Sequence, residues 1–410
     1  MSTPLRAGII GAGYIATWHA DAIKQTAGVK LAAVCDVSEG AARDLAEPRG
    51  ATVFTDVDAM LSSGTVDAVH ILTPPQLHAD LAEKALRAGV AVLVEKPVAT
   101  SADEMRAMAN AARESGNLLA VGHNFLSLPG YERLKAARAA GKIGRISAAE
   151  FNWCFPLAPL RSGPFGLWML REPKNLLLEL APHLFAFAVD LFGDIDVLDV
   201  HLSHPTKLPG GATRHQSWRI LARAGHVDIT VNLSTVETLD DRSLTLRGSN
   251  GLAKYDYAAD ALVVRSENAA DLIVNPLVNQ LTQSVGHLRE GVINAVRQTL
   301  SLNRKSAYGL SFLGITAAFY DALANKGEID PRFNAASGVK VMDALQQVMD
   351  RLPAKGAETH NHPPRTRDPK PDVMVIGGTG FIGAHLTRTL VAKGHDVRVV
   401  SRGTRGPFPD

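Results

Sequence analysis

The sequence predicts an α/β protein that begins with a doubly wound parallel sheet. Between Arg6 and about Gly122, short apolar runs alternate with segments of helical pattern. This alternation is typical of parallel strands covered by helices on both faces. The first apolar run is also followed directly by a glycine-rich turn that opens a helix. We therefore expect a Rossmann domain over residues 1–123.

Six strands and the helices between them are expected in this domain. The predicted strands are residues 7–10, 31–35, 52–54, 68–72, 91–94 and 118–121. Ser101 and Glu104 form a capping box, which satisfies exposed amides at a helix start. Pro75 suits the first turn of another helix.

The pattern changes after Gly122 and predicts a second α/β domain over residues 124–352. An apolar helix is expected to reach Leu191 and to stop at Gly193. Residues 226–235 alternate apolar and polar side chains, which indicates an open, mostly antiparallel sheet with one face in solvent. Helices return from about residue 276 to residue 352.

The composition is that of an ordinary globular protein. The chain has 410 residues, of which 46% are apolar and 20% are charged, and a formal net charge of +2. Without a run of like charge, we expect neither a nucleic acid nor a membrane as partner. Residues 176–192 are apolar but include charged residues and Pro182, which argues against a membrane span. Two isolated thiols, Cys35 and Cys154, predict buried, reduced cysteines in a cytoplasmic protein.

The glycine-rich turn has the pattern of a dinucleotide-binding fingerprint. Gly11 permits a tight turn, Gly13 lets the main chain approach a pyrophosphate, and Ala16 allows close packing of helix on strand. The predicted cofactor contacts of this turn are Gly11, Gly13, Tyr14, Ile15 and Ala16. Asp36 ends the next strand, where a carboxylate accepts hydrogen bonds from ribose hydroxyls and repels a 2′-phosphate. NAD is therefore expected rather than NADP, and no metal is expected.

Two later strand ends carry candidate site residues. Thr73 and Pro74 follow residues 68–72, and Glu95-Lys96-Pro97 follows residues 91–94. Alone, Lys96 would be a surface lysine paired with Glu95. Because ligands of open parallel sheets bind beyond the carboxyl ends of the strands, we expect Lys96 to hold a substrate oxygen and to stabilise alkoxide character.

These motifs, in this order, resemble the Gfo/Idh/MocA oxidoreductase family over about residues 5–352. The resemblance rests on residues 11–16, 73–78 and 94–97. It implies NAD(P)-dependent oxidation or reduction of sugars, polyols or sugar nucleotides, and a homo-oligomer formed through the sheet of the second domain. It also implies cofactor contacts by Thr73, Pro74, His78, Glu95 and Lys96.

The resemblance further implies that Lys96 contacts the reacting hydroxyl, that His183 is the general base and that Glu179 assists His183. Residues four apart share a face of a continuous helix. Because Pro182 has no N–H, it belongs in a first turn or marks a kink, so we expect a helix start near Leu180 with Glu179 just outside it. Lys174-Asn175 and Ala186 depart from the glycine pair and the aspartate more usual in the family.

The C-terminal part predicts a linker and an incomplete second domain. Residues 353–371 are rich in proline, and His360 and His362 in this stretch are expected to be solvated rather than to bind metal. Residues 372–410 resemble the opening strand–helix–strand of extended short-chain dehydrogenases, with Arg402 where a 2′-phosphate would be held. A complete domain of that type needs more chain, so we expect the front of a longer fusion.

Three functions remain open at this point. The first is an NAD-dependent dehydrogenase of a sugar, polyol or sugar-nucleotide alcohol. The second is an enzyme that recycles a tightly bound NAD, through glycoside cleavage or epimerisation by transient oxidation. The third is an inactive cofactor-binding regulator or scaffold. Arg161 and Arg171 are either contacts for an anionic group of the substrate or solvated loop residues.

Overall fold

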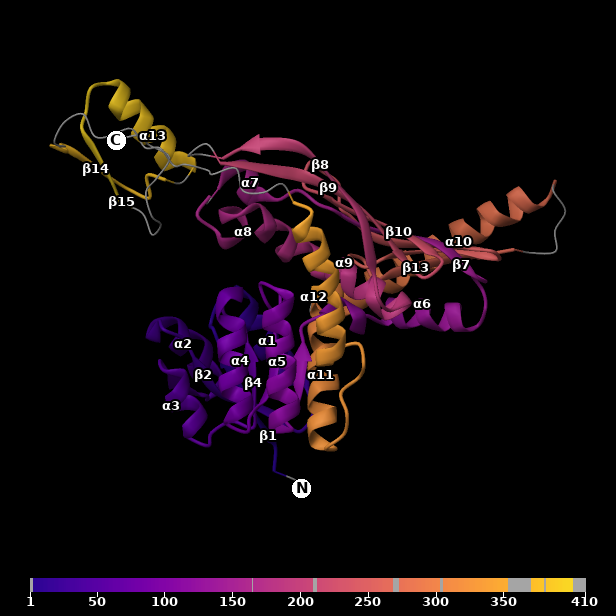
Figure 1. Ribbon diagram of the computed structural model, residues 1–410, viewed down its shortest axis with the longest axis horizontal. Coiled ribbons are helices and arrows are strands. Elements are labelled where there is room, and N and C mark those ends of the chain that lie inside the picture. Colours follow the sequence, from indigo (N-terminus) through magenta and orange to yellow (C-terminus); the bar gives the residue numbers. More distant parts are fainter. Residues whose placement is uncertain are drawn as a thin grey trace.

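The computed structural model describes residues 3–163, 165–208, 212–267, 273–302, 305–352, 370–379 and 381–400. Its first domain contains a six-stranded parallel sheet of order β3-β2-β1-β4-β5-β6 (Figure 1). The strands are β1 (Leu5–Ile10), β2 (Val29–Cys35), β3 (Thr52–Phe54), β4 (Ala68–Ile71), β5 (Ala91–Val94) and β6 (Leu119–Val121). All six predicted strands are confirmed within one or two residues at each end.

Short helices connect these strands. They are α1 (Tyr14–Gln25), α2 (Glu39–Ala46), η1 (Glu47–Arg49), α3 (Val57–Ser62), η2 (Pro75–Leu77), α4 (His78–Arg87) and α5 (Ala102–Ser115). The Ser101 hydroxyl caps α5 by accepting from the Glu104 amide at 3.2 Å, as predicted. The Glu104 carboxylate reaches back to the amide of Thr100 rather than to that of Ser101.

The second domain is built on a seven-stranded sheet of order β13-β12-β11-β7-β10-β9-β8. The strands are β7 (Ile146–Cys154), β8 (Asp196–Lys207), β9 (Thr213–Ala224), β10 (Val227–Ser234), β11 (Asp241–Gly248), β12 (Gly251–Asp256) and β13 (Ala261–Ser266). The predicted open sheet is confirmed. One pair, β7 with β10, is parallel, and every other pair is antiparallel.

Alternation along the strands separates the two faces of this sheet. On β10, Ile229 and Val231 are buried, whereas Thr230 and Asn232 are half-buried and Asp228 is exposed. The apolar face packs against the long helix α9 (Pro173–Phe192).

Helix α9 corrects one prediction. It runs without a break through Pro182, so Glu179 lies inside the helix rather than just outside it. Pro182 lacks only the N–H that would bond to the carbonyl one turn earlier. Fifteen residues of this helix are buried, and packing of this extent outweighs the loss of one helical hydrogen bond.

The remaining helices of this part are η3 (Asn124–Ser127), α6 (Pro129–Ala139), α7 (Ala158–Ser162), α8 (Trp168–Arg171), α10 (Asn275–Leu300), α11 (Ala307–Ala324) and α12 (Ala335–Asp350). Helices α11 and α12 lie beside the first domain (Figure 1). Trp18 of α1 packs on Tyr308 of α11 with ring centroids 4.9 Å apart. The predicted division at residue 123 assigns both helices to the second domain. Helix α11 packs on α1 of the first domain, and α12 packs on both α5 of the first domain and α9 of the second.

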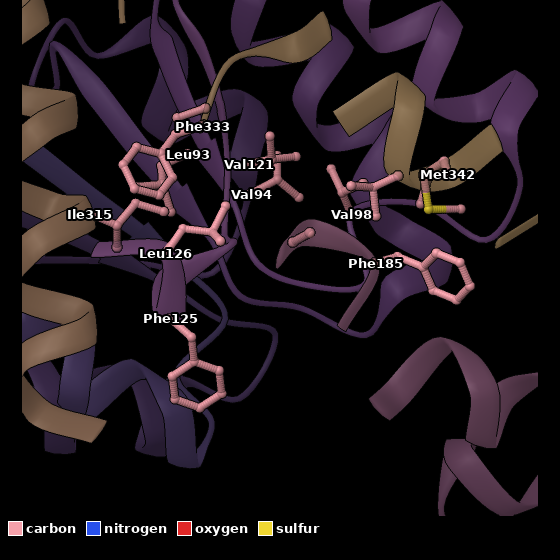
Figure 2. Packing of buried hydrophobic residues seen from close by; sticks show 14 of the residues in the cluster. Leu93, Val94, Val98, Val121, Phe125, Leu126, Phe185, Ile315, Phe333 and Met342 are labelled. Atoms are coloured by element: carbon pink, nitrogen blue, oxygen red, sulfur yellow. The ribbon is translucent and has the colours of Figure 1, made fainter. Parts of the chain in front are cut away.

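A shared apolar core holds the segment from α11 to α12 beside the first domain. Figure 2 shows Phe333 and Ile315 beside Leu93 and Leu126. The amide of Val121 in β6 donates to the Phe333 carbonyl at 2.8 Å. The late segment therefore covers the edge of the first sheet.

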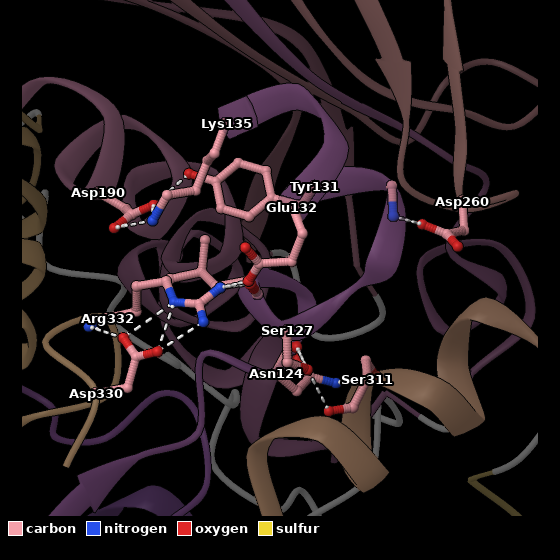
Figure 3. A network of polar contacts seen from close by, with 12 residues as sticks. Asn124, Ser127, Tyr131, Glu132, Lys135, Asp190, Asp260, Ser311, Asp330 and Arg332 are labelled. Carbon is pink, nitrogen blue, oxygen red and sulfur yellow. Dashed lines mark hydrogen bonds and ion pairs between the residues drawn. The ribbon is translucent and has the colours of Figure 1, made fainter. Parts of the chain in front are cut away.

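Polar contacts reinforce the junction around α6 (Figure 3). The Tyr131 hydroxyl donates to Asp190 of α9 at 2.6 Å. Asn124 donates to the Ser311 hydroxyl of α11 at 2.8 Å. The Arg332 guanidinium donates to the Leu126 carbonyl of η3 at 2.7 Å. These bonds connect both domains to the segment that leaves the first sheet.

The C-terminal part contains β14 (Val373–Ile376), α13 (Phe381–Ala392) and β15 (Val397–Val400). The two strands pair in parallel, as predicted. Large apolar side chains are exposed there, including Ile376 at 78% and Ile382 at 79%. Residues 353–369, with His360 and His362, and Arg402 lie outside the described residues.

The two cysteines were predicted to be buried and reduced. Cys35 is buried, as predicted, but Cys154 is half-buried, because it lies at the end of β7; both are free thiols.

Two described helices, α9 and α11, are long and apolar enough to cross a membrane. The α9 window is 83% buried, as in core helices of globular proteins, and the α11 window is 44% buried.

Candidate active site at the carboxyl edge of the first sheet

The glycine-rich turn fits a dinucleotide. Gly11 has φ +98°, and a Cβ there would come within 2.9 Å of the Leu72 carbonyl. Gly13 begins α1 without a side-chain cap, and a Cβ at Gly13 would meet nothing within 4 Å. An uncapped helix start beside open space is suited to a pyrophosphate. Tyr14 is exposed and Ala16 is buried against the core, while Ile15 is half-buried.

Asp36 lies beside this turn at the end of β2. One carboxylate oxygen accepts from the Ala12 amide at 2.7 Å, and the other accepts from the Ser38 amide at 2.8 Å. These bonds fix the carboxylate next to the glycine-rich turn. Its remaining lone pairs are suited to ribose hydroxyls.

Thr73 and Pro74 follow β4 at the same edge of the sheet. The Thr73 hydroxyl oxygen is buried and has no hydrogen-bond partner among the described residues. A buried hydroxyl without a partner is rare and marks a place where a ligand or water is expected. Pro74 is exposed.

His78 lies between the loops that follow β4 and β5. Its side chain is buried, and its two ring nitrogens face the Pro97 carbonyl at 2.9 Å and the Thr73 carbonyl at 2.8 Å. Burial lowers the pKa of His78, although both carbonyls and the Glu95 charge oppose that shift. His78 therefore ties two strand-end loops together, and both of its ring nitrogens are engaged inside the protein.

Glu95 is buried and is held by two neighbouring groups. One oxygen lies 3.1 Å from the His19 ring, and the other accepts from the Lys96 amide at 2.9 Å. Burial alone would raise the pKa of Glu95. The hydrogen bond and charge of His19, together with Lys96, outweigh burial and hold that pKa below its usual value.

The Lys96 side chain crosses from β5 to α9. Its Nζ lies 2.6 Å from Glu179 Oε1 and 3.2 Å from the Glu179 carbonyl oxygen. Lys96 is 19% exposed and Glu179 is 25% exposed. The ion pair therefore lies at the wall of the site and is open on one side.

His183 lies one turn along α9 and is 6% exposed. Its ring lies 4.7 Å from Phe125 and stacks on Trp153 at 5.2 Å with an interplanar angle of 8°. Burial lowers the pKa of His183 well below its usual value, and the charges of Lys96, His123 and Arg242 add to the shift. The imidazole is therefore neutral at pH 7.

The predicted support of His183 by Glu179 has no direct contact behind it among the described residues. The Glu179 carboxylate bonds to Lys96, and no hydrogen bond links it to His183 within the described part of the chain. Residues on one helix face can bond to each other but need not do so. Here Lys96 of the facing domain bonds to Glu179 instead, because a charged ammonium is a stronger donor than a neutral imidazole.

Sequence reasoning missed the wall beyond His183. The guanidinium of Arg242 lies 5.3 Å from the Trp153 ring and 5.0 Å from the Phe155 ring, and it pairs with Asp240 at 2.6 Å. Alternation along β7 could have placed Trp153 on the same face as Phe151 and Phe155. Nothing in the local sequence indicates that Arg242 of β11 covers this face.

The departures noted in the sequence have structural roles. The Asn175 amide donates to the Trp168 carbonyl at 2.8 Å and so ties α9 to α8, and Ala186 is buried. Arg171 donates to the Gly166 carbonyl at 3.2 Å and is exposed. The side chain of Arg161 lies outside the described residues.

Comparisons with known proteins agree with this geometry. The model of the family GFO_IDH_MocA, described as "Oxidoreductase family, NAD-binding Rossmann fold", matches residues 5–123. The model of the NAD dependent epimerase/dehydratase family matches residues 373–408, which confirms the second resemblance.

Among curated proteins, inositol 2-dehydrogenase of Rhizobium meliloti is 36% identical over 335 residues, 79% of this chain and 98% of that enzyme. The 1,5-anhydro-D-fructose reductase of Ensifer adhaerens is 32% identical over 43% of this chain and 54% of that protein. A levoglucosan dehydrogenase in complex with NADH and levoglucosan has the same fold, with a TM-score of 0.69, 19% identity and coverage of 85% of this chain and 97% of that one. Because one relative matches over nearly its whole length, this chain belongs to the Gfo/Idh/MocA family of oxidoreductases and opens with an NAD-binding Rossmann domain.

Proposed function

We propose that this protein is an NAD-dependent dehydrogenase of a secondary alcohol on a sugar, polyol or sugar nucleotide. The observation that carries the proposal is the Lys96–Glu179 ion pair at the carboxyl edge of the Rossmann sheet, one turn from a neutral His183. The names of the relatives, including inositol 2-dehydrogenase and UDP-N-acetylglucosamine 3-dehydrogenase, support this substrate class.

Lys96 is the group that holds the reacting oxygen. An ammonium has three N–H donors, and two of them go to the carbonyl and carboxylate oxygens of Glu179. The third is available for a substrate hydroxyl. Its charge stabilises the negative charge that develops on that oxygen as the proton leaves.

His183 is the group that takes the proton. Its neutral ring has a free lone pair on one nitrogen, so it can accept the hydroxyl proton at neutral pH. NAD, when bound, supplies the hydride acceptor. Trp153 stacks behind the imidazole and limits the movement of that ring.

Three finer proposals accompany this function. NAD is preferred to NADP, because Asp36 places a negative charge where a 2′-phosphate would lie. The protein acts in the cytoplasm, an assignment supported by its two free thiols. It forms a homo-oligomer through the open face of the second sheet, where Leu198 and Leu221 on β8 and β9 are 53% and 48% exposed.

Replacement of Lys96 or His183 tests the chemistry. With the best substrate from a panel of sugars, polyols and nucleotide sugars, we expect Lys96→Met and His183→Asn to lower kcat by about 10²–10⁴-fold. The affinity for NAD, measured by NADH fluorescence, is expected to stay near that of the unmodified protein. Lys30→Met, at an exposed position near the start of β2, is the matched control.

The same assay distinguishes the rival functions. Turnover that survives both replacements would contradict the proposal, as would tight NAD binding without hydride exchange on any alcohol. Product formation without accumulation of reduced cofactor would instead indicate recycling of bound NAD.

The pH dependence follows from the lowered pKa of His183. The base works only when deprotonated, so activity is expected to persist as the pH falls through 6.5 and to decline only at lower pH. Arg242→Gln removes one positive charge that lowers this pKa, so its acidic limb should move to higher pH. The measurement is kcat/KM between pH 5 and pH 9, with Arg223→Gln as control. An acidic limb above pH 6.5 in the unmodified protein would contradict this assignment.

Asp36→Asn tests the choice of cofactor. Asparagine retains one acceptor oxygen for the neighbouring amides but removes the charge. We expect the ratio of kcat/KM for NAD over NADP to fall by about 10–100-fold, which corresponds to about 1.4–2.8 kcal/mol. A preference of the unmodified protein for NADP would overturn the assignment.

Light scattering tests the assembly. We expect a native mass that is a multiple of the 43.7 kDa chain. Leu221→Glu places a charge on the open sheet face and is expected to dissociate the assembly, because a buried unpaired charge is costly. Leu239→Glu, at a position that is 82% exposed, should leave the mass unchanged. A monomer in the unmodified protein would refute the proposed interface.

A further inference from the structure

Four buried polar side chains form a continuous chain of hydrogen bonds behind Lys96. Glu95 lies 3.1 Å from Nε2 of His19, and Nδ1 of His19 lies 2.8 Å from Nδ1 of His70. Nε2 of His70 lies 3.1 Å from the Tyr320 hydroxyl. The four residues come from the end of β5, α1, β4 and α11, and none is more than 7% exposed.

The bonds of this chain fix one proton, and the charge of His19 decides the others. A carboxylate only accepts, so Nε2 of His19 donates to Glu95. Burial, with the neighbouring His19 charge, lowers the pKa of His70 well below its usual value, and His70 is therefore neutral. If His19 is neutral, Nδ1 of His70 donates to it and Nε2 of His70 accepts the Tyr320 proton; if His19 is protonated, its Nδ1 donates to His70 and Nε2 of His70 donates to the Tyr320 oxygen. In both arrangements both ring nitrogens of each histidine are engaged and His19 donates to Glu95.

Aromatic packing holds these rings in place. The His70 ring stacks on Tyr320 at 5.7 Å with an interplanar angle of 21°. The His19 ring makes an edge contact with Phe312 at 5.0 Å. Since close-packed interiors leave little room for other rotamers, the direction of the Glu95 carboxylate is fixed by its surroundings.

The orientation of Glu95 acts directly on the reactive lysine. The oxygen of Glu95 that does not face His19 accepts the Lys96 amide proton at 2.9 Å. This bond fixes the main chain from which the Lys96 side chain reaches Glu179. His19 also lies on α1, whose first turn faces the dinucleotide site, so the chain of bonds connects the cofactor helix to Lys96.

We propose that His19, His70 and Tyr320 are positioning residues, which hold Glu95 in one orientation and thereby hold the main chain of Lys96. None of the three touches the reacting atoms. The kinetic consequence rests on the proposed function, whereas the effect on the Lys96 amide does not. The competing explanation is a buried network that contributes only to stability.

The test uses substitutions that conserve volume. His19→Phe removes the donor to Glu95, and His19→Gln restores a donor near the position of Nε2. His70→Phe and Tyr320→Phe interrupt the chain further from Lys96. Tyr131→Phe is the matched control, because it removes an equally buried hydroxyl that donates to a carboxylate, Asp190, in another network.

The first measurement is hydrogen exchange at the Lys96 amide, followed by mass spectrometry with fragmentation. Loss of one hydrogen bond predicts exchange about tenfold faster in His19→Phe, a smaller acceleration in His70→Phe and Tyr320→Phe, and near-normal exchange in His19→Gln. The second measurement is steady-state kinetics. We expect kcat to fall in the same order, with KM for NAD close to that of the unmodified protein.

The outcomes separate the explanations. Unchanged exchange at Lys96 in His19→Phe would overturn the proposal whatever the kinetics. Equal effects of Tyr131→Phe and of the network variants on exchange and kcat would also overturn it, since they indicate general destabilisation. If the unmodified protein turns over no alcohol, the dehydrogenase proposal fails, and the exchange measurement still decides the positioning role. If His19→Phe does not fold, Tyr320→Phe provides the same comparison.

Discussion

The ion pair between Lys96 and Glu179 is the contact on which the candidate site depends, because it is the point where β5 of the first domain meets α9 of the second. Both partners are partly exposed, so the pair contributes little to stability on its own. Its importance is geometric. It sets the distance between the sheet edge that carries the dinucleotide turn and the helix that carries His183.

Stability of this junction comes from elsewhere. Phe333 and Ile315 fill the space beside β5 and β6 (Figure 2), and Val121 bonds to the Phe333 carbonyl. Burial of such side chains contributes about 1.5–3 kcal/mol each, more than an exposed ion pair provides. The packing of Ile315 and Phe333 against β5 and β6 thus holds the domains together, and the charged groups organise the site.

The first sheet could be predicted closely because its strands are buried on both faces and read as unbroken apolar runs such as Ala91–Val94. The dinucleotide turn and Lys96 could be placed for the same reason, since strand ends of a parallel sheet converge on one edge. The parallel pairing of β7 with β10 and the packing of α11 on α1 could not, because they depend on contacts between distant segments.

The direction in which individual side chains point could not be predicted from the sequence either. Glu95 and His78 belong to motifs expected at the cofactor edge, and the side chains of both bond to buried partners. The reason lies with His19 and with the Pro97 carbonyl, which offer buried partners that no local pattern specifies. A polar residue in a binding motif can therefore either contact the ligand or form hydrogen bonds inside the protein. Which of these it does depends on whether buried hydrogen-bond partners lie next to it.

The number of N–H donors left free on Lys96 limits how firmly this lysine can hold a substrate. With two of its three N–H groups directed at Glu179, a single hydrogen bond remains to hold the reacting oxygen, and one bond cannot fix the orientation of a polyhydroxylated ring. Orientation must then come from the walls, where Trp153 stacks behind His183 and Arg242 covers Trp153. Under the proposed function, specificity among sugars is accordingly expected to depend on β7 and β11, whereas Lys96 and His183 are the residues proposed to carry the chemistry.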